Sequence, residues 1–80
     1  MFKLTIAEAE DIVYEGDVEI LNIYTSHGQV GILANHVPFV DTVMASEMSF
    51  VDKDGQKHIL ATSGGWLFVW QTAVTVLVNA

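Results

Sequence analysis

Turn signals recur along this chain roughly every 8–12 residues, a spacing that favours short strands and leaves little room for helices. Polar or glycine-containing turns are expected at residues 8–11, 15–17, 26–28, 52–55 and 71–72. The segments between them alternate apolar and polar side chains or are rich in β-branched and aromatic residues, and none shows sustained helical spacing. We therefore expect an all-β fold, either a sandwich or a barrel.

Nine segments are expected to form strands, and together they cover most of the chain. They are residues 2–7, 12–14, 17–26, 30–33, 39–45, 48–51, 57–61, 66–70 and 73–78. In the third segment the apolar side chains change face near Leu21 to Ile23, which indicates a β-bulge or a change of face. Gly64 and Gly65 are adjacent between two strands, and such a pair indicates a bulge or a backbone contact that a side chain would block.

Residues 28–39 combine two glycines with the only proline of the chain. Gly28 and Gly31 allow a positive φ or a close backbone approach, while Pro38 restricts the backbone on either side of its own nitrogen. The stretch therefore predicts a short strand that leads into a specific irregular loop. Its apolar side chains are expected to be buried: Val30, Ile32 and Leu33.

Composition excludes several classes of function. The 80 residues suffice for one domain, and ten acidic residues against three lysines give a net charge of −7. Such a chain has no basic patch for nucleic acid or for anionic lipid. Charged residues make up only 16% of the chain, below the usual quarter, and mean hydropathy is +0.40. Part of the apolar surface is therefore expected to contact another protein.

No pattern in the sequence indicates catalysis, a metal or a cofactor. Cysteine is absent, and the three histidines lack the ligand spacing of a metal site. His27 and His36 are expected to be structural or interface residues, and His58 is expected to be exposed beside the turn at 52–55. Ser63 lacks the preceding glycine of a nucleophile elbow, and no lysine follows the glycine pair as in a phosphate loop.

Residues 66–70 form a dense aromatic segment with a period of two. Leu67 and Val69 are expected to face the core, so that Trp66, Phe68 and Trp70 share the opposite face. We interpret this stripe as a face for a partner protein, since large exposed apolar patches mark interfaces. One alternative buries both faces within the sandwich. An alternative function is that of a small β module that binds a ligand such as a carbohydrate through Trp66 and Trp70. A third function, that of a cupin-like metalloenzyme, is disfavoured because no HxH pattern is present.

Three blocks of sequence occur together in a fixed order. They run from Ile12 to Glu19, from Gly28 to Pro38, and from Ser63-Gly64-Gly65 to the closing Val74-Thr75-Val76-Leu77. Together they resemble the N-terminal β-sandwich domain of the epsilon subunit of F-type ATP synthase, over residues 1–80. The resemblance implies a ten-stranded β-sandwich of two antiparallel sheets with no C-terminal helical hairpin.

The same resemblance implies a function that is mechanical rather than catalytic. A subunit of this kind belongs to the central stalk and couples proton-driven rotation of the c-ring, through the gamma subunit, to ATP synthesis. It would lie peripherally on the cytoplasmic side of a bacterial-type inner membrane, without inserting into lipid. The chain stops at Ala80, where the regulatory helical arm of many family members begins, so neither that arm nor an ATP site is expected.

The resemblance also assigns residues to the two partners. Gln29 and Gly31 match positions that meet the c-ring, although the residue at Gln29 is usually acidic in the family. The residues expected at the gamma subunit are His36, Asp41, Ser63, Trp66 and Phe68. Asp41 stands where a small polar residue is common, and Phe68 replaces a commonly acidic one. The stripe formed by Trp66, Phe68 and Trp70 is expected to dock on gamma or, in the isolated domain, on a second copy.

Overall fold

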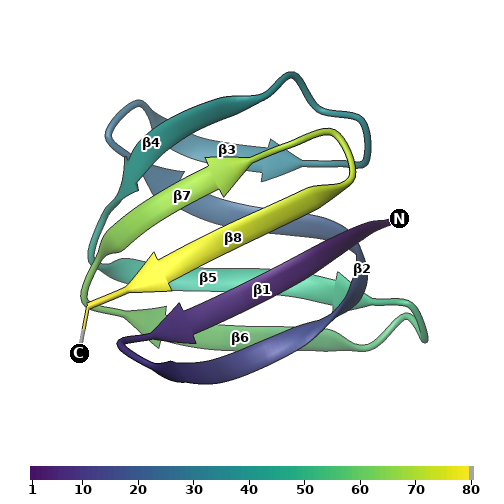
Figure 1. Ribbon diagram of the computed structural model, residues 1–80, viewed down its shortest axis with the longest axis horizontal. Helices are drawn as coiled ribbons and strands as arrows, with labels where there is room; N and C mark the ends of the chain where they lie inside the picture. Colours follow the sequence, from purple (N-terminus) through teal and green to yellow (C-terminus); the bar gives the residue numbers. More distant parts are fainter. Residues whose placement is uncertain (80) are drawn as a thin grey trace.

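Eight strands make up the computed structural model, which describes residues 1–79 (Figure 1). The strands are β1 (Phe2–Glu8), β2 (Asp11–Thr25), β3 (Gly28–Ile32), β4 (Phe39–Val43), β5 (Ser46–Asp52), β6 (Lys57–Thr62), β7 (Gly65–Val69) and β8 (Ala73–Val78). The predicted all-β class is confirmed, but the expected count of ten strands is too high. The turn predicted at residues 15–17 does not form, because Gly16 pairs with Leu4 and β2 continues through it.

The long strand β2 contributes to both layers of the sandwich. Its first half pairs with β1, and β8, β7 and β4 follow in that order to complete the first layer. Its second half pairs with β3 on one side and β5 on the other, and β6 completes the second layer. The expectation of purely antiparallel sheets is wrong at one place, since β1 and β8 run parallel. Apolar periodicity sets the faces of a strand but does not specify its neighbours.

A β-bulge in β2 lets both halves of the strand point apolar side chains into one core. Val18 pairs with Asp52 and Ile20 with Val51, so Glu19 is the extra residue. The bulge reverses the alternation, so that Val18 and Leu21 are both fully buried. The predicted change of face is confirmed, but it lies at Glu19 rather than near Leu21 to Ile23. The core lies between the two layers and includes Phe2, Leu4, Ile6, Val18, Leu21, Ile23, Ile32, Met48, Phe50, Leu67, Val69, Val74 and Val76.

The loop after β3 differs from expectation at one residue. Ile32 is buried and Val30 packs against the core, but 59% of Leu33 is exposed. The predicted burial of Leu33 is therefore wrong, because alternate residues of an extended chain point to opposite sides. The loop is nevertheless fixed in place, since Asn35 has φ 63° and its backbone N–H donates to the carbonyl of Gln71 at 2.7 Å.

The predicted hairpin at residues 52–55 is present and contains a further polar contact. The N–H of Gly55 donates to the carbonyl of Asp52 at 3.0 Å, and Gly55 has φ 80°. His58 is half-buried rather than exposed beside this turn. Its ring stacks on Phe50 with centroids 4.8 Å apart, and its Nε2 lies 2.8 Å from a carboxylate oxygen of Asp52.

Candidate partner interface

The aromatic segment on β7 alternates as the sequence predicted. Leu67 and Val69 are buried, whereas 48% of Trp66 and 57% of Trp70 are exposed and Phe68 is partly exposed. The alternative in which the sandwich buries both faces of this segment is therefore wrong. The outward side chains are large and apolar, which is the composition expected at the centre of a protein interface.

Neighbouring strands extend this exposed apolar surface across the first layer. Leu77 of β8 lies opposite Trp66, and Val40 of β4 lies opposite Phe68. Ile12 of β2 continues the row that contains Leu77, through Ala7 of β1. Residues opposite one another on adjacent strands share a face. We call this surface the outer apolar face, and it consists of Ile12, Val40, Trp66, Phe68, Trp70 and Leu77.

Ile12, Val40 and Leu77 were missed at the sequence level. Between 41% and 58% of each of these side chains is exposed. No sequence signal assigns them to the same surface as Trp66, because they come from three other strands whose order only the fold defines. The aromatic stripe of one strand is in fact the centre of a surface formed by four strands.

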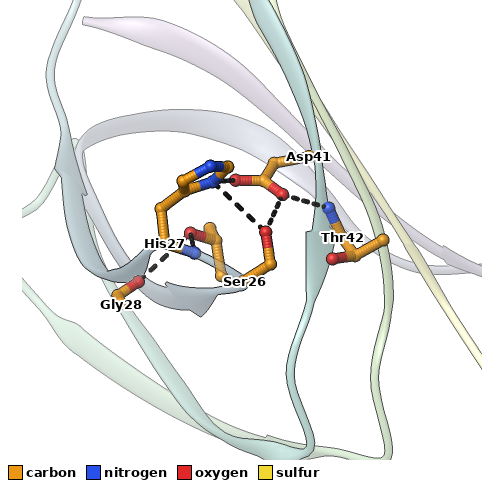
Figure 2. Close-up of polar contacts among 6 residues, drawn as sticks. Ser26, His27, Gly28, Asp41 and Thr42 are labelled. Atoms are coloured by element: carbon orange, nitrogen blue, oxygen red, sulfur yellow. Dashed lines mark hydrogen bonds and ion pairs between the residues drawn. The ribbon is translucent and has the colours of Figure 1, made fainter.

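Asp41 does not belong to the outer apolar face. It shares a side of β4 with Val43 of the core and lies at the border between the two layers. One carboxylate oxygen accepts hydrogen bonds from Ser26 Oγ at 2.6 Å and from the backbone N–H of Thr42 at 2.7 Å (Figure 2). The other oxygen lies 2.6 Å from Nδ1 of His27. The hydrogen bond from Ser26, followed by that from His27, lowers the pKa of the Asp41 carboxyl well below its usual range.

The Ser26, His27 and Asp41 cluster is not arranged for nucleophilic catalysis. In a catalytic triad the serine hydroxyl gives its proton to the ring nitrogen that does not face the carboxylate. Here the hydroxyl of Ser26 donates to Asp41 itself, and it approaches the same Nδ1 of His27 that faces the carboxylate, at 3.2 Å. This arrangement connects two segments of backbone and leaves the serine without a base.

The structure places His36 and Ser63 far apart, at opposite ends of β7. His36 Nδ1 donates to the carbonyl of Val37 at 2.9 Å, in the loop beside the turn between β7 and β8. Ser63 Oγ donates to the carbonyl of Asn79 at 3.2 Å, just before β7 begins. The five residues expected at the gamma subunit are therefore not one cluster: Trp66 and Phe68 lie together, and the other three lie elsewhere.

Gln29 and Gly31 lie on the second layer and face away from the core. They alternate with Val30 and Ile32, which pack inward. Gln29 pairs with Tyr24 of β2, and it borders a shallow hollow. The other residues that line this hollow are Asn22, Tyr24, Glu47, Met48, Ser49, Lys57 and Ile59. The two residues expected at the c-ring are thus separated from the outer apolar face by the thickness of the sandwich.

Among residues 1–79, no group of three or more histidine or acidic side chains is arranged to hold a metal ion. In the same part of the chain, no helix has the length and apolar character needed to cross a membrane.

Fold and surface together define a small two-layer β domain that presents the outer apolar face on one layer and the outward residues Gln29 and Gly31 of β3 on the other. Residues 1–80 match the family model described as ATP synthase, Delta/Epsilon chain, beta-sandwich domain, and the chain belongs to this family. It is 41% identical, over 81 aligned residues, to the ATP synthase epsilon chain of Ruminococcus albus. The alignment covers the whole chain but only 60% of that relative.

Two solved structures have the same fold. A chain of the mitochondrial ATP synthase of Euglena gracilis, in a structure that includes the c-ring, superposes with a TM-score of 0.90 and 23% identity, over 96% of this chain and 49% of its own. A chain from the central stalk and c-ring of the Tetrahymena thermophila mitochondrial ATP synthase gives a TM-score of 0.79 at 10% identity, over 99% of this chain and 63% of its own. At these identities the likeness shows the fold alone.

Proposed function

We propose that the chain is a non-catalytic part of the central stalk of an F-type ATP synthase, where it couples rotation of the c-ring to the gamma subunit. The observation that carries the proposal is the outer apolar face of a domain that belongs to this family. An apolar surface centred on two exposed tryptophans is stabilised when a partner removes it from water.

The two layers of the sandwich suit a rotor component because they offer separate surfaces for separate partners. We assign the gamma subunit to the outer apolar face of the first layer, around Trp66 and Phe68. We assign the c-ring to the outward side of β3 in the second layer, around Gln29 and Gly31. A part that transmits torque must connect its two contacts rigidly, and β2 provides this connection because it runs through both layers. His36 and Ser63 lie outside both surfaces, and we assign them at most to the edge of the contact between gamma and the outer apolar face.

The location follows from the assigned partners. A domain bound to the c-ring lies at a membrane without entering it. We assign the domain to the cytoplasmic side of a bacterial inner membrane, and its similarity to a bacterial epsilon chain supports this assignment. The net charge of −7 supports contact through protein rather than through anionic lipid.

Co-purification tests this function. The tagged chain is expressed with the gamma subunit and the c-ring and isolated in mild detergent; we expect all three components to elute together. A chain that recovers neither partner would refute the proposal.

The carbohydrate-binding alternative gains no support from the geometry. The hollow beside Gln29 and a second hollow beside Asp52 are both lined by residues other than Trp66 and Trp70. A ligand-binding module would be expected to place its aromatic side chains in a concave site.

A further inference from the structure

The carboxylate of Asp41 connects two parts of the chain that belong to different layers. Asp41 lies on β4 of the first layer, whereas Ser26 and His27 form the turn between β2 and β3 of the second layer (Figure 2). An ionised carboxylate only accepts hydrogen bonds, so Nδ1 of His27 is the donor in its 2.6 Å contact with Asp41. One acidic side chain thus accepts from Ser26, from His27 and from the backbone of its own strand.

The turn itself has a geometry that depends on its last residue. Among the turn residues, positive φ occurs at Gly28, with φ 100°, and not at Ser26 or His27. This is the pattern of a type I turn followed by a bulged glycine, not of the tight primed turns that match strand twist by themselves. Thr25 Oγ1 braces the turn, because it accepts from the N–H of His27 at 3.1 Å and donates to the carbonyl of Gly28 at 3.2 Å.

Few backbone bonds attach this turn to the first layer. Thr25 is the only residue of β2 that pairs with β4 in the described chain. Two backbone hydrogen bonds flank this pair: the N–H of Ser26 donates to the carbonyl of Thr42 at 3.2 Å, and the N–H of Met44 donates to the carbonyl of Tyr24 at 2.9 Å. Beyond the turn, β3 is an edge strand whose one partner among the described strands is β2. Beyond these two backbone bonds, the side chain of Asp41 adds the hydrogen bonds to Ser26 and His27 that hold the turn itself against β4.

We propose that Asp41 is a positioning residue that holds the turn at residues 26–28 against β4 and thereby sets the orientation of Gln29 and Gly31. Gln29 follows the turn directly, so a tilt of the turn moves it first. This inference rests on the proposed function, in which these two residues meet the c-ring. It gives Asp41 a role within the domain in place of the gamma contact that the family resemblance suggested.

Amide hydrogen exchange in the isolated chain tests the effect on the turn without any partner. Asp41→Ala removes every acceptor, while Asp41→Asn keeps one oxygen for Ser26 or Thr42 and removes the charge. We expect exchange at the Ser26 amide to accelerate about tenfold in Asp41→Ala and by less in Asp41→Asn. The matched control is Asp52→Asn, which removes the other aspartate–histidine contact at the far hairpin and is expected to leave Ser26 unchanged. Unchanged exchange at Ser26 in a folded Asp41→Ala chain would overturn the inference.

Binding to detergent-solubilised c-ring, measured beside binding to gamma, tests the consequence. We expect affinity for the ring to fall about fivefold in Asp41→Ala, less in Asp41→Asn, and not at all in Asp52→Asn, with affinity for gamma unchanged in each. A variant whose turn exchanges faster but whose ring affinity equals the wild type would also overturn the inference. If the wild-type chain itself fails to bind the ring, the proposed function is refuted, and exchange at Ser26 alone then decides the role of Asp41. If Asp41→Ala does not fold, judged by circular dichroism, the comparison of Asp41→Asn with Asp52→Asn decides both points.

Discussion

A β-carbon on Gly65 would overlap the backbone carbonyl of Leu77, because the backbone of Gly65, with φ 155°, directs this position at the neighbouring strand β8. Gly65 also pairs with Val43 of β4 on its other side, so β7 cannot shift away from Leu77 without disturbing this second pairing. We expect Gly65→Ala to lower the free energy of unfolding by on the order of 3 kcal/mol, measured by urea denaturation.

The control for this prediction is Gly55→Ala, at the tip of the hairpin between β5 and β6. Gly55 has φ 80°, but no atom lies within 4 Å of the position that an added methyl group would take, so only backbone strain opposes the change. We expect a loss of about 1 kcal/mol there. Equal losses at the two positions would show that the close contact with Leu77 is not what requires glycine at position 65.

The position of Phe68 on the outer apolar face predicts the effect of a charge. Phe68 points away from the core, so Phe68→Glu is expected to change the free energy of unfolding by less than about 1 kcal/mol. The same carboxylate would be buried without a partner when gamma binds, and we expect the affinity for gamma to fall by at least about 30-fold, as for an interface hot spot. Isothermal titration with purified gamma measures this.

Ile59→Glu is the matched variant for Phe68→Glu. Ile59 is 59% exposed on the second layer, so it introduces the same charge at a similarly accessible apolar site on the opposite side of the sandwich. We expect its affinity for gamma to equal that of the wild type. If the two variants bind gamma equally well, the outer apolar face is not the gamma surface.

The lowered pKa of Asp41 predicts a specific loss of stability in acid. The unfolded chain binds a proton at this carboxyl near pH 3.8, whereas the folded chain binds it only at lower pH. Its contribution is therefore fully present above pH 3.8 and is lost as the pH falls below that value. We expect the difference in unfolding free energy between the wild type and Asp41→Asn to be constant near neutrality and to shrink progressively from about pH 4 downward.

Denaturation series at several pH values measure this difference. Asp52→Asn removes another carboxyl whose pKa is lowered, mainly by the hydrogen bond from His58. This variant is expected to lose the acid-sensitive stability that Asp52 contributes and to retain the part that Asp41 contributes. Glu10→Gln, in an exposed turn, controls for the change in net charge. A difference between wild type and Asp41→Asn that stays constant down to about pH 2 would contradict the assignment.

Local sequence patterns predicted those parts of the fold that depend on neighbouring residues. The glycine pair predicted the close contact at Gly65. The change of face expected near Leu21 to Ile23 indicated a bulge in β2, which the structure has at Glu19. The same local patterns wrongly predicted a turn that interrupts β2 at Gly16, because a glycine between two acidic residues is typical of a turn. Pairing with β1 along the whole segment outweighed that preference.

The contacts of Asp41 could not be predicted in this way, because Ser26 lies 15 residues away in the sequence. One signal was nevertheless present. Asp41 is the only acidic residue between Phe39 and Ala45, on the same side of the strand as Val43 of the core. A carboxylate in that position requires hydrogen-bond donors, so a partner from a distant turn is expected even when its identity is not.

The exposure of Trp66 and Trp70 predicts a change in fluorescence when the outer apolar face is covered. Both indole rings are about half exposed in the free chain, so acrylamide is expected to quench their emission efficiently. Binding of gamma would remove this surface from water, and we expect the Stern–Volmer constant to fall by about half or more as gamma saturates the chain. Oligosaccharides are expected to leave quenching unchanged. If an oligosaccharide but not gamma protects the indole rings from quenching, the ligand-binding alternative is favoured, because only a molecule bound on the outer apolar face can shield these rings.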